Sequence, residues 1–203
     1  MFIGKYNKSL IVTYIGVIFA IVGMYFAFEL KAKYAMICLI VAGVCDLFDG
    51  KIARMCKRNK EEVSFGIQLD SLADIVDFVL FPIVFGLTLG LNKWFHLIGY
   101  CMLAMAGIQR LAHFNVLVEN KKEEGPVKSY SGLPVTSTSI TFPLIWLLSN
   151  WIGTEAYHIV YIGLVYLTAF LFVFNIKVPK FRGIAYPILA VIAILGIISL
   201  FLV

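Results

Sequence analysis

Seven long apolar stretches dominate this chain of 203 residues and limit the folds open to it. They cover residues 9–29, 34–55, 66–91, 94–117, 133–151, 155–175 and 183–203. A helix needs about 20 apolar residues to cross a bilayer. None of the stretches alternates apolar and polar residues as a lipid-facing barrel strand does. The sequence therefore predicts an all-α, polytopic integral membrane helical bundle that forms a single membrane domain over residues 1–203.

The composition agrees with lipid as the main solvent. Apolar residues make up 61% of the chain and charged residues 14%, with a mean hydropathy of +0.92. A soluble domain is about half apolar and about a quarter charged. The net charge of +5 sits on no soluble basic module, so no nucleic-acid partner is expected. The cysteines show no CxxC spacing, which predicts free thiols and no structural metal site.

The basic residues predict an orientation. Lys and Arg collect in cytoplasmic loops. With the N-terminus inside and seven spans, all of the 17 Lys and Arg residues except Lys31, Lys33 and Lys93 fall on the inner side. This pattern predicts a multi-pass protein with a cytoplasmic N-terminus and with cytoplasmic loops at 55–65 and 118–132. A basic inner surface also attracts the anionic headgroups of membrane lipids.

Five carboxylates interrupt the second and third apolar stretches. They are Asp46, Asp49, Asp70, Asp74 and Asp77. A charge at the centre of a membrane helix costs about 2.5–3.5 kcal/mol on insertion scales, so such residues face the bundle interior, pair with a partner or bind ions.

The spacing of the aspartates places them on two helix faces. Positions 46, 49, 50 and 53 follow i, i+3, i+4 and i+7, and positions 66, 70 and 74 lie one turn apart. The hydrophilic segment 55–65 is expected to be a cytoplasmic loop that makes the two helices antiparallel neighbours. Four carboxylates, those of Asp46, Asp49, Asp70 and Asp74, are therefore predicted to converge near the cytoplasmic interface.

Four converging carboxylates need cations to neutralise them. An oxygen-only ligand set selects Mg²⁺, Mn²⁺ or Ca²⁺, and two divalent ions would balance four carboxylates. Such a site suits phosphoryl transfer. Gly50, Ala53 and Gly66 would leave room for a ligand, and Arg54 could reach a diphosphate. The alternatives are that the aspartates pair with Lys51 and Arg54, or that they line a proton or cation path in a transporter.

These residues resemble the signature of the CDP-alcohol phosphatidyltransferase family. That signature is Asp-x-x-Asp-Gly-x-x-Ala-Arg, then a short gap, then Gly-x-x-x-Asp-x-x-x-Asp. Its fixed positions are filled here by Asp46, Asp49, Gly50, Ala53, Arg54, Gly66, Asp70 and Asp74. The gap at 55–65 is longer than in many members, and the extra residues are expected to lengthen the loop at 57–62.

The resemblance implies a six-helix core over about residues 7–175, with a polar cavity open to the cytoplasm and an additional C-terminal span at about 183–203. It implies that Asp46, Asp49, Asp70 and Asp74 hold two divalent cations, Mg²⁺ or Mn²⁺, and that Asp74 is also the general base. The acceptor alcohol would then attack the lipid-side phosphorus and expel CMP. The resemblance also implies a homodimer.

The CDP-lipid site implied by the resemblance includes further residues. The cations and Arg54 would hold the diphosphate, while Gly50 and Ala53 would leave room for the cytidine. Gly66 lies on the same face as the third and fourth aspartates. Asn7 stands where the family often has polar residues near the nucleotide, and Ser64 is either a ligand contact or the N-cap of the third helix.

Three further runs resemble the phosphatidylserine synthase branch of the family: Ser-Leu-Ala-Asp at 71–74, Arg-Leu-Ala-x-Phe-Asn at 110–115 and Gly-Leu-Pro at 132–134. His113 and residues 136–139 depart from that branch. The resemblance implies that CDP-diacylglycerol, or CDP-archaeol, and L-serine give phosphatidylserine, or archaetidylserine, and CMP. Glycerol 3-phosphate or inositol phosphate as the acceptor, and a cation transporter, are the alternatives.

A pocket for the acceptor is expected from Arg110, Asp77, Asn115, Ser131 and Gly132. Arg110 either pairs with the serine carboxylate or contacts lipid phosphate as a positive-inside residue. Asp77 either orients Asp74, lines this pocket or forms a structural ion pair. The turn at Gly132 either frames the pocket or simply starts the fifth helix.

Overall fold

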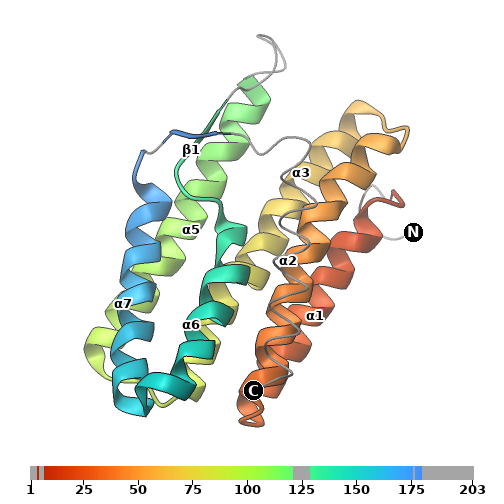
Figure 1. Ribbon diagram of the computed structural model, residues 1–203. Coiled ribbons are helices and arrows are strands. Elements are labelled where there is room, and N and C mark those ends of the chain that lie inside the picture. Colours follow the sequence, from red (N-terminus) through yellow and green to blue (C-terminus); the bar gives the residue numbers. More distant parts are fainter. Residues whose placement is uncertain (1–3, 5–6, 121–128, 176, 180–203) are drawn as a thin grey trace.

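A computed structural model describes residues 4, 7–120, 129–175 and 177–179 of the chain (Figure 1). The span expected at 183–203 lies outside these residues, as do the loop residues 121–128. The helices run roughly side by side with their long axes close to one direction (Figure 1). The prediction of an all-α bundle is confirmed over the described residues, where the exception is a short ribbon in which β1 (Ser129–Ser131) pairs antiparallel with β2 (Lys177–Pro179).

Six of the seven apolar stretches form the helical bundle. The helices are α1 (Leu10–Phe28), α2 (Ala32–Met55), α3 (Lys60–Asp74), which continues through the π-helical η1 (Ile75–Leu80) into α4 (Phe81–Thr88), then α5 (Trp94–Asn120), the 3₁₀ turn η2 (Val135–Ser137), α6 (Thr138–Ile152) and α7 (Thr154–Val173). In the described part of the chain, the helices that begin at residues 10, 60, 94 and 154 are long and apolar enough to span a membrane. Helix α2 has 24 residues but carries the charged motif, and α6 has 15 residues.

Small residues let α1 pack closely against α2. The buried face of α1 carries Gly16, Ala20, Gly23 and Ala27, three or four residues apart. Small residues at this spacing let helix backbones approach in a membrane, where apolar side chains gain little by leaving lipid. The opposite face of α1 exposes large apolar side chains such as Ile18. The α1–α2 pair thereby forms one wall of the site described below.

Helix α3 begins earlier than the sequence suggested. Asn59 is its N-cap, because the Asn59 Oδ1 accepts a hydrogen bond from the Glu62 backbone N–H at 2.8 Å and Glu62 Oε2 accepts one from the Asn59 N–H at 2.8 Å. This reciprocal capping box satisfies two otherwise unpaired donors. The expected loop at 55–65 is therefore wrong in extent, since residues 60–65 are helical. The N-cap alternative for Ser64 is also wrong, because Ser64 lies inside α3.

A local break in the helix follows Asp74. Residues Ile75–Leu80 are π-helical, and Pro82 is the second residue after them. Proline has no N–H to donate to the carbonyl four residues earlier. That carbonyl belongs to Phe78, and it accepts a hydrogen bond from Thr138 Oγ1 at 3.0 Å. The hydroxyl of Tyr161 donates to the Pro82 carbonyl at 2.6 Å. Helices α6 and α7 thus fix the irregular segment beside the aspartates.

Candidate active site

Carboxylates from the second half of α2 meet carboxylates from the last two turns of α3. One carboxylate oxygen from each of Asp46, Asp49 and Asp70 lies within 4.8 Å of the others. Asp74 lies close enough to Asp46, Asp49 and Asp70 to interact electrostatically with each of them. The four signature aspartates are therefore together in the structure.

The donor set fits divalent cations. Asp49 is 6% exposed, and its Oδ2 accepts a hydrogen bond from Thr13 Oγ1 at 2.8 Å. Among the described residues no basic side chain forms an ion pair with these aspartates, so the alternative in which Lys51 and Arg54 neutralise them finds no support. Closely spaced buried and half-buried carboxylates, without basic partners among the described residues, match the hard oxygen ligands that Mg²⁺, Mn²⁺ and Ca²⁺ take.

A small cavity of about 140 Å³ lies beside the aspartates. Its lining residues come from α1, α2, α3 and the loop between the last two: Ser9, Leu10, Thr13, Asp49, Gly50, Ala53, Arg58, Gly66, Ile67 and Asp70. A Cβ at Gly50 would meet no other atom within 4 Å, so this residue borders open space. The three small signature residues Gly50, Ala53 and Gly66 therefore line the cavity next to two of the carboxylates.

Three other residues expected at the lipid-nucleotide site do not line this cavity. Arg54 is exposed near the end of α2. Asn7 lies three residues before α1, and its Oδ1 accepts a hydrogen bond from the Ser9 N–H at 3.1 Å. Ser64 is half-buried within α3. The structure places Ser9 and Arg58, rather than these three, at the cavity wall.

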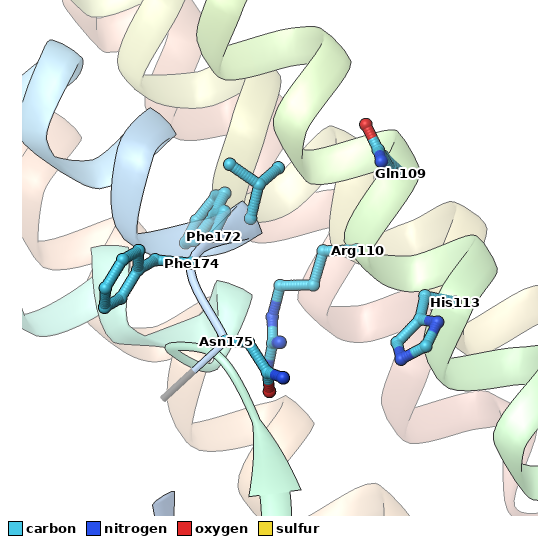
Figure 2. A pocket seen from close by; sticks show the side chains of 7 residues that line it. Gln109, Arg110, His113, Phe172, Phe174 and Asn175 are labelled. Atoms are coloured by element: carbon cyan, nitrogen blue, oxygen red, sulfur yellow. The ribbon is translucent and has the colours of Figure 1, made fainter. Parts of the chain in front are cut away.

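A larger cavity of about 300 Å³ lies between the end of α7 and the second half of α5. Its lining residues are Gln109, Arg110, His113, Phe172, Val173, Phe174 and Asn175. Figure 2 shows the Arg110 side chain extending from α5 toward Asn175, with His113 on the same side and Gln109 further away. Arg110 is thus a cavity residue.

Gly132 is held against this cavity in a conformation that favours glycine. Its φ is +80°, and a Cβ there would lie 3.0 Å from both Arg110 Nη1 and the Phe172 carbonyl oxygen. L-residues rarely adopt such a φ. The glycine therefore brings the turn after β1 directly against the Arg110 guanidinium. Ser131 precedes it in β1, and its side chain lies outside the described part of the structure.

Asn115 ties α5 to α3 and does not line either cavity described above. It is 9% exposed; its Oδ1 accepts a hydrogen bond from Ser71 Oγ at 2.9 Å, and its Nδ2 donates to Gln68 Oε1 at 3.1 Å. These bonds set the register of two helices that run in opposite directions (Figure 1). Arg110 lies five residues before Asn115, about 7.5 Å along α5 at 1.5 Å per residue. Asp74 follows Ser71 in the same direction along the bundle, so Arg110 and Asp74 lie at similar depth.

Asp77 points toward α1 and does not line the larger cavity, called the Arg110 cavity below. It is 4% exposed, and its Oδ1 has no hydrogen-bond partner among the described residues. A Cβ at Gly16 would lie 3.2 Å from Asp77 Oδ2, so the carboxyl group sits against the α1 backbone. No ion pair to Asp77 is present in the described parts of the chain. The structure thus places Asp77 against α1, three residues after Asp74.

Comparison with known proteins decides the family. The sequence profile of CDP-alcohol phosphatidyltransferases matches residues 7–174. This chain belongs to the CDP-alcohol phosphatidyltransferase family. The match covers α1 to α7 and every residue that lines the two cavities except Asn175.

Named relatives of this phosphatidyltransferase include serine enzymes. A CDP-diacylglycerol–serine O-phosphatidyltransferase from Helicobacter pylori is 30% identical over 181 residues, which are 83% of this chain and 70% of that protein. A protein of the same name from Saccharomyces cerevisiae is 35% identical over 103 residues, 49% of this chain and 36% of that protein. An archaetidylserine synthase from Methanothermobacter thermautotrophicus is 28% identical over 115 residues, 56% of this chain and 46% of that protein.

Two residues of this phosphatidyltransferase site were missed from the sequence. Thr13, like Asn7, stands where the family often has polar residues near the nucleotide, but nothing local to it indicates that it meets Asp49 on another helix. Arg58 lies in a loop outside the signature positions. The Asn59–Glu62 capping pattern can be recognised in the sequence. It predicts a helix that begins directly after Asn59, and therefore a shorter loop with Arg58 next to α3.

Proposed function

We propose that this protein transfers a phosphatidyl or archaetidyl group from CDP-diacylglycerol or CDP-archaeol to the hydroxyl of L-serine, with release of CMP. The observation that carries the proposal is the meeting of four signature aspartates beside a cavity lined by the signature's small residues. Family membership supports the transfer chemistry, and the printed names of the relatives support serine as the acceptor.

Asp46, Asp49, Asp70 and Asp74 are proposed to hold two divalent cations, Mg²⁺ or Mn²⁺. Bound there, these cations supply contacts to phosphate oxygens and offset charge on the leaving group. The small cavity beside Asp49 and Asp70 is proposed to take part of the CDP headgroup, since Gly50 leaves open space at its edge.

Asp74 is proposed as the general base. It would accept the serine hydroxyl proton from within hydrogen-bond reach, about 2.6–3.2 Å. The serine oxygen then forms a bond to the lipid-side phosphorus, and the bond from that phosphorus to the CMP oxygen breaks. The π-helical segment that begins at Ile75 supports this role, because single π turns inside α-helices are frequent at functional sites.

The Arg110 cavity is proposed as the site of the serine carboxylate. A guanidinium pairs with a carboxylate through two parallel hydrogen bonds. Arg110 lies at a depth in the bundle similar to that of Asp74. This position supports the binding of an acceptor whose carboxylate meets Arg110 while its hydroxyl points at Asp74. Among the residues that line this cavity, Arg110 and His113 carry the basic groups. A phosphorylated acceptor needs more positive charge than this, which favours the amino acid.

The proposed topology is multi-pass, with the N-terminus and the active site facing the cytoplasm. The end of α2 and the start of α3 carry four exposed basic residues, Lys51, Arg54, Lys57 and Lys60. Basic residues of this kind mark cytoplasmic ends of membrane helices. The chain is further proposed to be one membrane domain and to form a homodimer, as the family resemblance implies.

The test is a product assay. The purified protein is incubated with CDP-diacylglycerol or CDP-archaeol, Mn²⁺ and a panel of radiolabelled acceptors: serine, glycerol 3-phosphate and inositol phosphate. The proposal predicts a labelled aminophospholipid and CMP with serine only. Label in a phosphorylated product would replace serine as the acceptor, while absence of CMP with every acceptor would refute the transferase function.

A further inference from the structure

The position of Arg58 is fixed by the start of α3. Asn59 is the N-cap, and the two hydrogen bonds of its capping box with Glu62, both 2.8 Å long, hold the backbone at this point. Arg58 is the residue directly before the N-cap. The loop between α2 and α3 is only residues 56–59, so Arg58 has little freedom to move away from the ends of both helices.

The Arg58 side chain faces the small cavity of about 140 Å³ beside the aspartates. It is half-buried, whereas the neighbouring basic residues Lys57 and Lys60 are exposed. A Cβ at Gly66 would lie 3.4 Å from Arg58 Nη1, so the guanidinium lies over the glycine on the cavity wall. The same cavity is lined by Asp49 and Asp70. Among the described residues, neither of these aspartates forms an ion pair with Arg58.

A guanidinium on the wall of a cavity has donors to offer an anion. Arg presents its N–H groups in a planar fork that matches phosphate oxygens, and it keeps its charge at any physiological pH. Because Gly66 has no side chain, the guanidinium can lie close to the α3 backbone at the cavity wall. Arg54, the basic residue of the family signature, is exposed and does not line the cavity.

We propose that Arg58 binds the diphosphate of the CDP-lipid, as a nucleotide-binding residue that this chain supplies from outside the family signature. This inference rests on the proposed function. The group that Arg58 would bind is a phosphate oxygen. The diphosphate is favoured over the phosphate of a bulk membrane lipid, because the cavity is also lined by Asp49 and Asp70, two of the residues proposed to hold the cations.

The experiment uses soluble CDP as the probe, because it carries the diphosphate without a lipid tail. Calorimetry on the full-length protein in detergent with saturating Mn²⁺ gives the CDP affinity of the wild type, Arg58→Gln, Arg58→Lys and Lys57→Gln. The last variant removes the same charge from an exposed site in the same loop. Loss of a hydrogen bond to a charged group predicts about a tenfold or greater weakening for Arg58→Gln. Arg58→Lys keeps the charge without the fork and is expected to lose less, and Lys57→Gln is expected to match the wild type.

Each outcome decides the matter. Equal CDP affinity in the wild type and Arg58→Gln would overturn the inference, and a defect only in binding to vesicles of anionic lipid would assign Arg58 to bulk lipid phosphate instead. Equal losses in Arg58→Gln and Lys57→Gln would show a general charge effect and would also overturn it. Wild-type protein that binds no CDP with Mn²⁺ would refute the proposed function itself. The rise in melting temperature on addition of Mn²⁺ is measured for each variant as a check of folding. CDP affinities are compared only among variants that keep this rise.

Discussion

The hydroxyl of Thr13 on α1 donates a hydrogen bond of 2.8 Å to Oδ2 of Asp49 on α2. The bond joins residues 36 positions apart and lies among buried atoms. It fixes one carboxylate oxygen of Asp49, which belongs to the same cluster as Asp46 and Asp70. A helix with no acidic residue of its own thus orients a member of the aspartate cluster.

Replacing Thr13 by Val is expected to weaken cation binding. Partners that orient a metal ligand typically contribute about 10–100-fold to metal affinity. Thr13→Val keeps the shape of the side chain and removes the donor, whereas Thr13→Ser keeps the donor. Calorimetric Mn²⁺ titration should therefore show a loss for Val and little change for Ser. Equal affinities in Val and wild type would show that the bond does not orient Asp49.

The hydrogen bonds of Asn115 are expected to stabilise the packing of α3 against α5. Asn115→Ala leaves the buried Ser71 hydroxyl without its acceptor. Interhelical hydrogen bonds in membrane proteins contribute about 0.6 kcal/mol on average and up to about 1.7 kcal/mol. A double-mutant cycle with Ser71→Ala, measured by unfolding in detergent, should give a coupling free energy in this range. Asn150→Ala is the control, since Asn150 is exposed and, among the described residues, donates its side-chain hydrogen bond to Leu147 within α6. Its effect should stay within about 0.5 kcal/mol.

Gly132→Ala is expected to damage the Arg110 cavity. The new Cβ would lie 3.0 Å from Arg110 Nη1, and the φ of +80° would be strained for alanine. Gly153→Ala is a matched control, because Gly153 has a φ of +74° and no atom within 4 Å of a Cβ. Both variants should lose stability through backbone strain, but only Gly132→Ala should raise the KM for serine. An unchanged KM in Gly132→Ala would separate this turn from the acceptor site.

Asp74→Asn is expected to separate binding from chemistry. It keeps one oxygen ligand and removes the base, while Asp46, Asp49 and Asp70 remain to hold a cation. CDP-lipid binding by calorimetry should persist, and turnover with saturating serine should fall by about 10²-fold or more. Wild-type turnover would remove Asp74 as the base. Loss of binding together with turnover would make Asp74 chiefly a metal ligand.

The sequence predicted the helices well where length and apolar composition alone define them. Helix α1 covers Leu10–Phe28 against the expected 9–29, and the convergence of aspartates follows from i, i+3 and i+4 spacing on two antiparallel neighbours. The beginning of α3 was missed because its first residues, Lys60, Glu61 and Glu62, are charged. Charge excludes such residues from an apolar window, whereas it does not prevent a capped helix from forming in water.

Contacts between helices could not be read from the sequence. The π-helical segment has no local signal, since it depends on partners such as Thr138 and Tyr161 from α6 and α7. The direction of Asp77 was equally open, because the irregular segment changes which face of the helix it lies on. Helical spacing predicted which residues share a face, and the tertiary partners determined what each face meets.

The most direct test of a cation-dependent transferase is serine-dependent CMP release by the purified protein with CDP-diacylglycerol or CDP-archaeol. Wild type should release CMP with Mg²⁺ or Mn²⁺, stop after exhaustive chelation and recover when the cation returns. Asp70→Ala should remain inactive under all three conditions while it keeps its helical circular dichroism. Full CMP release after chelation, or near-normal release by Asp70→Ala, would contradict catalysis at the four aspartates.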